Sequence, residues 1–456
     1  MIKITNTLTG EKEFFKPLDA NKVKMYVCGI TPYDAAHIGH GRVSVVFDAF
    51  YRLLKFLNYD VEYCRNYTDI DDKLLKKAEK EFGDQLRYKE IAKKYIKLYT
   101  QDVEKLNCLT PDFEPLVTEN IPEIIKFIKK LIDLGHAYVV DNDVYFSIKS
   151  FDEYLKLSKQ NMDDLKAGSR VQVSEKKKDP LDFALWKGTQ EGTFWESPWG
   201  WGRPGWHIEC SVLGNKYLGD QLDIHGGGMD LIFPHHENEI AQSEAHNKKQ
   251  FVKYWMHNAF VRIDKEKMSK SLGNFFTLAQ VFEKIDPILV RYYILKHHYR
   301  APLDFDFEEL EASKKSYNKL ANTFYNIECG EHTLEEVQAS PIAGKMLEFL
   351  SDDLNVSGAL GVVFEHLSDL KENSKELCLV KLILTEVLGF TLKPITEKKV
   401  EITPEIQKLI DERVQARKNK DWAKADAIRD QLTQMGIDVQ DPSILAVGTT
   451  QDRSKN

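Results

Sequence analysis

Residues 24–41, KMYVCGITPYDAAHIGHG, decide the fold of the first part of this chain. Residues 24–29 form a short apolar-rich run that predicts a strand, and Thr31-Pro32 breaks the run. Apolar side chains then recur at helical spacing, at Val43, Val46, Phe47, Phe50, Leu53, Leu54 and Leu57. We therefore expect a strand, a tight turn and a helix that opens at His40-Gly41.

A helix that begins directly after a strand can bind an anion, because its first N–H groups have no partner within the helix and its N-terminal end is positive. Gly39 and Gly41 would let a phosphate approach the backbone closely. His37 and His40 could donate to a phosphoryl group that gains charge. An ordinary helix start without a ligand is the alternative.

A second segment, Lys267-Met268-Ser269-Lys270-Ser271, lies past the middle of the chain. Most lysines in such loops are solvated surface charges, so the segment alone carries little information. The two segments, however, occur in the order and at about the separation that a split nucleotide-binding fold needs. Together, His37-Ile38-Gly39-His40 and the lysine segment resemble the two ATP signatures of class I aminoacyl-tRNA synthetases.

Composition fits a large soluble enzyme of the cytoplasm. The chain has 456 residues, which is enough for about two to four domains with their own cores. Its formal net charge is -8, so a nucleic acid would have to meet local basic patches. No apolar stretch reaches membrane-spanning length, and residues 1–5 show no signal peptide, so no membrane partner is expected.

The cysteines lie far apart in the sequence, at Cys28, Cys64, Cys108, Cys210, Cys329 and Cys378. This spacing argues against a disulfide framework and for a reducing compartment.

Side chains that commonly bind metals gather around residues 205–239. Pro234 suits the first turn of a helix. In such a helix, His235 and Glu239 are four residues apart and lie on one face. One imidazole, one carboxylate and the thiolates of Cys28 and Cys210 would make a four-ligand zinc site. His236 is a competing ligand. Two buried structural cysteines beside a polar helix face are the alternative to a metal site.

Longer matches narrow the resemblance to one family, cysteinyl-tRNA synthetase. The matching segments are YVCGITPYD (26–34), TDIDDK (68–73), WHIEC (206–210), PHHENE (234–239) and KMSKSLGN (267–274). They are collinear over nearly the whole chain. The resemblance implies one zinc ion per chain, held by Cys28, Cys210, His235 and Glu239.

A zinc ion suits an enzyme that selects cysteine. Serine differs by one atom, and a shape-matched pocket rejects such a near isostere only weakly. A thiolate binds zinc directly, whereas a serine hydroxyl is a poor ligand at neutral pH. The residues that the resemblance implies for cysteine binding are Cys28, Gly29, Thr31, Thr68, Trp206 and His225. For Trp206 and His225, packing in the core is the alternative.

The nucleotide would lie against Gly226-Gly227-Gly228, which follows a strand-like segment at 222–224. As the family pattern implies, Asp230 could accept from a ribose hydroxyl. The cysteine carboxylate would attack the α-phosphorus of ATP, which gives cysteinyl-adenylate and pyrophosphate.

Positively charged and hydrogen-bonding groups are expected around the phosphates. Gly39, His37 and His40 would lie near the α-phosphate, and Lys267 and Lys270 would neutralise the departing pyrophosphate. Magnesium is expected to accompany ATP, although no residue identifies its ligands.

The expected fold class is α/β, with a Rossmann-like parallel sheet, an insertion, a helical bundle and a small C-terminal domain. The segments are 1–115 (first half of the catalytic fold), 116–200 (connective insertion), 201–310 (second half), 311–395 (helical bundle) and 396–456 (anticodon-binding domain). Within the insertion, residues 121–134 predict a helix and 139–146 a strand. The lysines at 176–178 could meet the tRNA acceptor end, or they form a solvated loop.

The C-terminal segment predicts two amphipathic helices, the first starting at Thr403-Pro404. Basic residues gather near Trp422, at Arg413, Arg417, Lys418, Lys420 and Lys424. An aromatic ring among basic residues suits single-stranded RNA, and a hairpin around a buried tryptophan is the alternative.

The resemblance implies anticodon readers in this segment, at Arg417, Trp422, Asp426 and Asp441. The family often ends in a glycine-rich segment that closes on a tryptophan. Here Gly448-Thr449-Thr450 leads to Gln451, so contacts at the extreme end differ from that pattern.

Three hypotheses follow. The leading one is an enzyme that ligates L-cysteine to tRNA(Cys), acting as a monomer on cysteine, ATP and the tRNA. The second is a related cysteine ligase, similar to the mycothiol-pathway enzyme, that transfers the same adenylate to a sugar amine. The third is a catalytically inactive RNA-binding regulator, which the complete ATP and zinc signatures disfavour.

Overall fold

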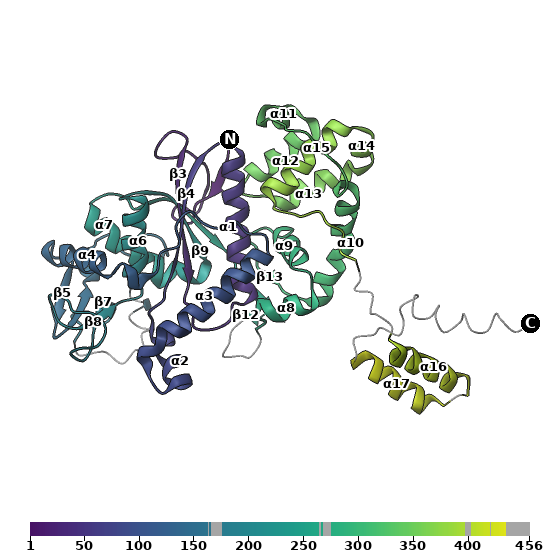
Figure 1. Cartoon of the computed structure of the whole chain (residues 1–456). Coiled ribbons are helices and arrows are strands. Elements are labelled where there is room, and N and C mark those ends of the chain that lie inside the picture. The colour runs from purple at the N-terminus through teal and green to yellow at the C-terminus, as the bar shows by residue number, and fades with distance from the viewer. Residues whose placement is uncertain are drawn as a thin grey trace, which may run out of the picture. The chain divides into compact units, whose positions relative to one another are not determined.

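The structure is a computed structural model that describes residues 1–162, 164–165, 176–263, 266–267, 275–396, 403–419 and 421–434 (Figure 1). The chain divides into two compact units, Met1–Pro394 and Ile395–Asn456. Within the ranges given, no helix combines the length and apolar character needed to cross a membrane.

A parallel sheet of four strands forms the centre of the first unit. Its order is β10-β9-β3-β4, and its strands are β3 (Lys22–Ile30), β4 (Asp60–Tyr67), β9 (Leu222–Gly228) and β10 (Val252–Asn258). The chain leaves β3 for β4 on one side and later adds β9 on the other. Ligands of open α/β sheets bind at the carboxyl ends of the strands at such a switch point. The predicted α/β class is confirmed.

Helix α1 (Ile38–Phe56) connects β3 to β4 and buries its predicted apolar face, including Phe47 and Phe50. The helix begins at Ile38, earlier than the expected opening at His40-Gly41. His37 is its N-cap, and His37 and His40 each accept a hydrogen bond from the other's backbone N–H. This reciprocal cap brings the histidine segment into the first turn.

The other elements of the catalytic fold surround this sheet. A small antiparallel hairpin, β1 and β2, precedes β3; helices α2 and α3 follow β4; and α6 and α7 flank β9 (Figure 1). Their bounds are β1 (Lys3–Thr5), β2 (Lys12–Phe14), α2 (Asp72–Phe82), η1 (Gln85–Arg87), α3 (Tyr88–Lys105), α6 (Ile208–Leu218), η4 (Met229–Leu231), η5 (Ile232–His236) and α7 (Glu237–Asn247).

The insertion carries its own antiparallel sheet of order β5-β6-β7-β8. The elements of this region are η2 (Val117–Glu119), α4 (Ile121–Asp133), β5 (Ala137–Val140), β6 (Asp143–Phe146), η3 (Ile148–Ser150), β7 (Phe183–Gly188) and β8 (Gly202–Pro204). Strand β8 lies just past residue 200, the boundary predicted for the insertion. The single strand predicted for 139–146 is wrong, because the chain turns at Asp141. That residue has a φ of 53°, a left-handed conformation in which aspartate is enriched.

A second small sheet of order β12-β11-β13 precedes the helical part of the unit. Its elements are β11 (Val261–Ile263), β12 (Glu266–Lys267) and β13 (Leu303–Asp304), and helices α8 (Leu278–Lys284) and α9 (Pro287–Leu295) lie between the last two strands in sequence.

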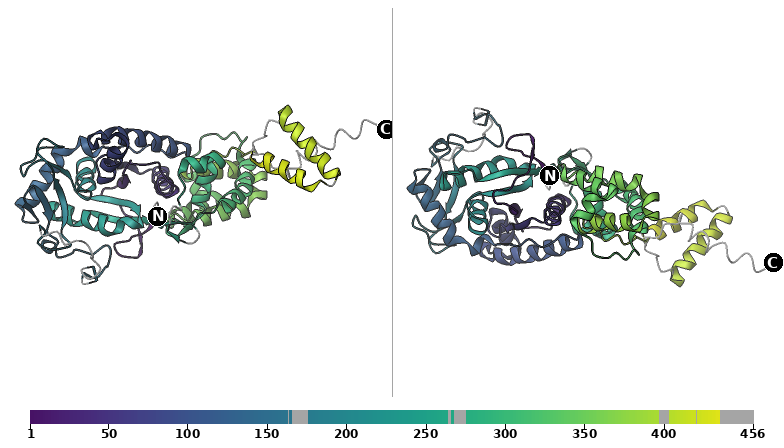
Figure 2. Two further views of the ribbon diagram at one scale, coloured as in Figure 1. Left: turned by 90° about the horizontal axis from the view of Figure 1, so that it is seen from below. Right: turned by 90° about the horizontal axis from the view of Figure 1, so that it is seen from above.

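A helical bundle follows, as expected for residues 311–395, and its first helix starts slightly earlier, at Phe307. It contains α10 (Phe307–Phe324), α11 (Leu334–Ala339), α12 (Pro341–Ser351), α13 (Val356–Glu365), α14 (Leu367–Glu372), α15 (Ser374–Leu382) and η6 (Ile383–Val387). Figure 2 shows these helices on the opposite side of the central sheet from strands β5–β8.

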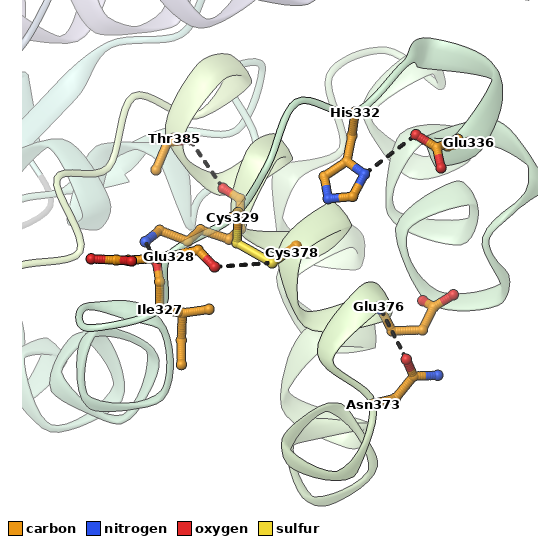
Figure 3. Close-up of a disulfide and its surroundings, with 10 residues drawn as sticks. Ile327, Glu328, Cys329, His332, Glu336, Asn373, Glu376, Cys378 and Thr385 are labelled. Atoms are coloured by element: carbon orange, nitrogen blue, oxygen red, sulfur yellow. Dashed lines mark hydrogen bonds and ion pairs between the residues drawn. A yellow bond between two sulfur atoms is a disulfide. The ribbon is translucent and has the colours of Figure 1, made fainter.

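A disulfide joins Cys329, in the segment after α10, to Cys378 of α15 (Figure 3). Their Cα atoms lie 5.5 Å apart although the residues are separated by 49 positions. The sequence-based argument against disulfides is therefore wrong for this pair, because helix packing brings together cysteines that are distant in sequence. Cys28, Cys64, Cys108 and Cys210 are free thiols.

In the second unit, the consecutive helices α16 (Pro404–Lys418) and α17 (Trp422–Gln434) pack against each other through one apolar cluster. The cluster consists of Ile406, Ile410, Ile428 and Leu432, with Leu409 packed against it. Thr403 caps α16 by accepting a hydrogen bond from the Ile406 N–H.

Candidate active site

A cavity of about 350 Å³ lies at the carboxyl ends of the central strands, beside the N-terminus of α1. This is the switch point at which the fold predicts ligand binding. The predicted site residues that line it are Cys28, Gly29, Thr31, His37, Gly39, His40, Thr68, Trp206, Cys210, Gly228, Asp230 and His235. Segments far apart in the sequence thus contribute to one cavity.

Four buried donor groups meet at one part of this cavity. Cys28 lies near the end of β3, Cys210 in the first turn of α6, His235 in η5 and Glu239 in the first turn of α7. The Cys28 sulfur lies 3.6 Å from the Cys210 sulfur and 3.6 Å from Glu239 Oε1. His235 Nε2 lies 3.5 Å from the Cys210 sulfur and 3.0 Å from Glu239 Oε1.

These separations fit a tetrahedral zinc site. With zinc–sulfur bonds of about 2.3 Å and zinc–nitrogen or zinc–oxygen bonds of about 2.0–2.1 Å, two sulfur ligands stand about 3.8 Å apart, sulfur and nitrogen or oxygen about 3.5 Å, and nitrogen and oxygen about 3.3 Å. Each of the four distances given above agrees with these values to within about 0.4 Å. The donor set therefore fits the metal that the sequence predicts.

His236 remains close to the same cluster. Its Nε2 atom lies 3.3 Å from the Cys28 sulfur, and Cys28, His225, His236 and Glu239 form a second set of groups within reach of one ion. The Nδ1 atom of His236 is hydrogen-bonded to His257 Nε2 at 2.7 Å. The set with Cys210 contributes a second thiolate, which is the softer ligand that zinc binds well.

The surroundings of Cys210 and Glu239 favour the anionic forms of these two side chains. Burial raises the pKa of the Cys210 thiol, but hydrogen bonds to Cys28 and His235 outweigh burial and hold it below its usual value. Burial also raises the pKa of Glu239. The neighbouring His225 and His235 have a larger, opposite effect, so the pKa of Glu239 lies below its usual value. Burial and the neighbouring Cys210 raise the pKa of Cys28. Zinc binding would release the Cys28 proton.

Aromatic and imidazole groups surround the four donors. The Trp206 indole stacks on the His235 ring with centroids 4.3 Å apart, is 38 % exposed and lines the cavity. His225 is wholly buried behind Glu239, and its Nε2 is hydrogen-bonded to Glu239 Oε2 at 2.8 Å. His207 Nδ1 lies 3.1 Å from His235 Nδ1. Such outer contacts orient metal ligands.

A buried polar chain next to the cluster contains Gly29 and Thr68, which the resemblance implies for cysteine binding, and Asn66 and Glu209, to which the sequence analysis assigns no role. The Gly29 N–H donates to Asn66 Oδ1 at 3.0 Å, and the Asn66 amide donates to the Thr68 hydroxyl at 3.3 Å. That hydroxyl donates to Glu209 Oε2 at 2.7 Å. The matching segments TDIDDK and WHIEC, which contain Thr68 and Glu209, were the available signal.

The two histidines of the N-terminal signature have a defined orientation. Their rings stack with centroids 3.7 Å apart, and Nδ1 of each accepts from a backbone N–H of the other residue. Because Nδ1 accepts, a neutral ring carries its proton on Nε2. His37 and His40 therefore have the tautomer that a donor to phosphate requires.

The three glycines lie inside β9 and have different surroundings. A Cβ atom on Gly226 would stand 2.2 Å from the Phe47 ring, so this glycine lets α1 pack closely on the sheet. A Cβ on Gly227 would meet Leu231 at 2.9 Å. Gly228 is the member of the run that lines the cavity, together with Asp230.

The lysine signature, Lys267-Met268-Ser269-Lys270-Ser271, is described only at Lys267. Lys267 lies in β12, where it is paired with Arg262 of β11. Lys270 lies outside the described residues. In the insertion, Lys176 forms ion pairs with Asp141 at 3.0 Å and Asp143 at 3.2 Å, so this lysine has acidic partners within its own domain.

The candidate RNA contacts lie in the second unit. Trp422 is 58 % exposed and stands outside the apolar cluster, so the alternative of a hairpin built around a buried tryptophan is wrong. Arg417 is exposed, and Asp426 forms an ion pair with Arg429 at 2.8 Å. Asp441 lies outside the described residues.

Comparison with known proteins identifies the class. Residues 14–315 match the family described as tRNA synthetases class I (C) catalytic domain. A solved Mycobacterium tuberculosis methionyl-tRNA synthetase in complex with methionyl-adenylate has a TM-score of 0.61, 14 % sequence identity, and coverage of 86 % of this chain and 94 % of that one. That likeness concerns the fold alone. The fold and the matched domain define a class I aminoacyl-tRNA synthetase.

Sequence relatives narrow the class to one family. Residues 399–443 match the Cysteinyl-tRNA ligase anticodon binding domain. The cysteine–tRNA ligase of Trichlorobacter lovleyi is 47 % identical, with 96 % of this chain and 98 % of that protein covered, and the one from a Geobacillus species is 46 % identical, with 96 % and 97 % covered. The chain belongs to the cysteine–tRNA ligase family.

Proposed function

We propose that the chain ligates L-cysteine to tRNA(Cys) in two steps, through a cysteinyl-adenylate formed from ATP with release of pyrophosphate. The observation that carries this proposal is the presence of two kinds of group in one cavity. The buried thiol, imidazole and carboxylate cluster suits cysteine, and the stacked histidines at the α1 N-terminus suit phosphate.

Cys28, Cys210, His235 and Glu239 would hold a zinc ion. When bound, the ion supplies a soft Lewis acid that accepts a thiolate and discriminates against a hydroxyl. Trp206 packs on the His235 ring and would help to shield this part of the cavity from water. The hydrogen bond from Asn66 to Thr68 and the one from Thr68 to Glu209 would hold the neighbouring part of the cavity wall in one arrangement.

His37 and His40 would donate hydrogen bonds from Nε2–H to the α-phosphate oxygens as the cysteine carboxylate attacks, and the α1 N-terminus adds its positive dipole end. Asp230 would accept from the ribose, and Gly228 would let the nucleotide approach β9. Lys267 and Lys270 would neutralise pyrophosphate, with magnesium bound to ATP. The protein contributes positioning and charge stabilisation, which is what phosphoryl chemistry needs.

The second unit would recognise the anticodon. Trp422 would stack on a base, with Arg417 meeting the backbone, and Asp426 and Asp441 would be further contacts. We expect the enzyme to act as a monomer in the cytoplasm, where tRNA is charged for translation.

Cysteine-dependent ATP–pyrophosphate exchange, run beside charging of bulk tRNA, tests this function. A cysteine–tRNA ligase shows both activities. Exchange without charging would favour the ligase that acts on a sugar amine, and absence of both would favour an RNA-binding protein without catalysis. Serine in place of cysteine is the matched control, and exchange with serine at the rate of cysteine would remove the zinc-based account of selectivity.

A further inference from the structure

Arg42 follows His40 by two positions in α1, and its side chain is wholly buried. Its guanidinium group donates to five backbone carbonyls: Nη1 to Ala259 at 2.8 Å and Phe260 at 3.0 Å, and Nη2 to His298 at 3.2 Å, Tyr299 at 3.1 Å and Ala301 at 2.5 Å. The planar fork of arginine can contact several acceptors at once, which a lysine ammonium does with less defined geometry.

The first two carbonyls belong to the segment that leads into the lysine signature. Ala259 and Phe260 follow β10, line the cavity and precede β11. Strand β11 pairs with β12, which ends at Lys267. The position of this hairpin relative to α1 therefore depends on where the 259–260 backbone is held.

The other three carbonyls belong to the segment between α9 and β13. Strand β13 pairs with β11, and the two segments are also joined directly, because the Ala259 N–H donates to the Tyr299 carbonyl and the Leu303 N–H donates to the Phe260 carbonyl. One side chain from the histidine helix thus contacts both segments from which β11 and β13 start.

Burying a cation costs free energy, and within the described residues every hydrogen bond that the Arg42 side chain donates goes to a backbone carbonyl. Burial lowers the pKa of Arg42 to about 10, so the group stays charged at neutral pH. Apolar side chains of similar volume often replace buried charges without loss of stability. Packing alone therefore does not account for this arginine, whereas a requirement for a fixed geometry between α1 and β11 does.

We propose that Arg42 is a positioning residue for adenylate formation, which holds the histidine end of α1 and the hairpin of the lysine signature at the separation that ATP requires. This inference rests on the proposed function, because both signatures must act on the same nucleotide.

Arg291 provides a matched control. It is also wholly buried, and its guanidinium donates to the carbonyls of Leu388, Leu106 and Asn107 and to the Asp48 carboxylate. These partners lie after η6, after α3 and in α1, away from the segment that leads to the lysine signature. Substitution of Arg291 should cost stability without moving β11.

The test compares Arg42→Lys and Arg42→Gln with Arg291→Lys in the full-length protein. The glutamine variant keeps a planar donor without charge, and it provides a second variant to assay if the lysine variant does not fold. We expect the Arg42 variants to slow cysteine-dependent exchange about ten- to a hundredfold, the scale for misplaced reacting groups. They should also weaken binding of a non-hydrolysable ATP analogue and retain wild-type zinc content. Arg291→Lys, assayed well below its melting temperature, should exchange at nearly the wild-type rate.

Two outcomes would overturn the inference. One is a folded Arg42 variant with wild-type exchange and ATP-analogue affinity. The other is a loss of exchange that follows melting temperature equally in the Arg42 and Arg291 variants, which would make Arg42 a stability residue only. If the wild-type protein binds the ATP analogue but shows no exchange, the proposed function fails, and the analogue affinities of the variants still decide the role of Arg42.

Discussion

Cys28 and Cys210 are separated by 182 positions in the sequence, and their sulfur atoms lie 3.6 Å apart. Cys28 lies near the carboxyl end of strand β3, and Cys210 lies in the first turn of helix α6. Neither element carries a second cysteine nearby, so the pair exists only because α6 packs against the sheet. Under the proposed function, this contact would bring together two of the four zinc ligands that select cysteine.

Replacement of one of these thiols should therefore remove the metal. We expect the purified protein to carry one zinc per chain, and Cys210→Ser to lose both zinc and cysteine-dependent exchange, because a serine hydroxyl is a poor zinc ligand. Elemental analysis of the dialysed protein measures this directly. Cys108→Ser, at a free cysteine outside the cluster, should keep its zinc. Full occupancy in a Cys28→Ser, Cys210→Ser double variant would eliminate the site.

The roles of the two adjacent histidines can be separated by competition with a chelator. His235→Gln should abolish tight zinc binding, because its Nε2 lies within ligand distance of both Cys210 and Glu239. His236→Gln should weaken binding by about ten- to a hundredfold, the usual effect of removing an outer partner. A larger loss of zinc affinity in His236→Gln than in His235→Gln would assign the metal to the set that contains His225 and His236.

Lys270 should act on ATP and leave the cysteine site intact. We expect Lys270→Ala to slow adenylate formation by about a hundredfold or more, the scale for loss of one contact in the transition state. Zinc content should not change. Lys284→Ala, at an exposed lysine of α8, is the control. If Lys270→Ala exchanges at the wild-type rate, Lys270 has no role in adenylate formation and is an ordinary surface lysine.

Local patterns in the sequence were enough to predict much of the catalytic fold. The strand and helix of residues 24–57 follow from apolar spacing, which depends on neighbours within a few positions. The pairing of His235 with Glu239 follows from the same local rule, since residues four apart share a helix face. The hairpin at 137–146 was missed because Asp141 adopts a left-handed conformation that apolar spacing does not reveal.

Contacts between distant segments could not be predicted. The bond of His225 to Glu239, the carbonyl partners of Arg42 and the Cys329–Cys378 disulfide each depend on how elements pack. The zinc ligands were obtained through a family resemblance, and spacing alone left His236 as a competitor. The assignment of individual site residues stays a prediction until the variants above are measured.

The disulfide should contribute to the stability of the helical bundle. For a closed loop of 49 residues, the chain-entropy model gives a stabilisation of roughly 4 kcal/mol. We expect reductant, or Cys329→Ser, to lower the free energy of unfolding in urea by up to about this amount. Exchange measured under native conditions should stay near the wild-type rate.

Peptide mapping without reductant provides the direct readout for the same pair. A digest should contain the peptides of Cys329 and Cys378 joined to each other, and Cys108→Ser should leave that product unchanged. If the joined peptides are missing and reductant has no effect on unfolding, the two cysteines are thiols in solution.

Trp422 should affect RNA recognition without affecting activation. Its ring is 58 % exposed, whereas the helix pair is held by Ile406, Ile410, Ile428 and Leu432. Because a stacked base contributes about 1 to 3 kcal/mol, Trp422→Ala should weaken tRNA charging by about ten- to a hundredfold. Cysteine-dependent exchange and the melting temperature should not change, since the substitution removes little buried surface.

Leu432→Ala is the contrasting variant, because Leu432 is fully buried in the same cluster. Removing a buried leucine costs about 2 to 5 kcal/mol, so this variant should unfold at lower temperature and lose charging in parallel. A Trp422→Ala protein that loses charging together with stability would place the ring in the packing of the helix pair. A stable variant with normal charging would remove Trp422 from the RNA site.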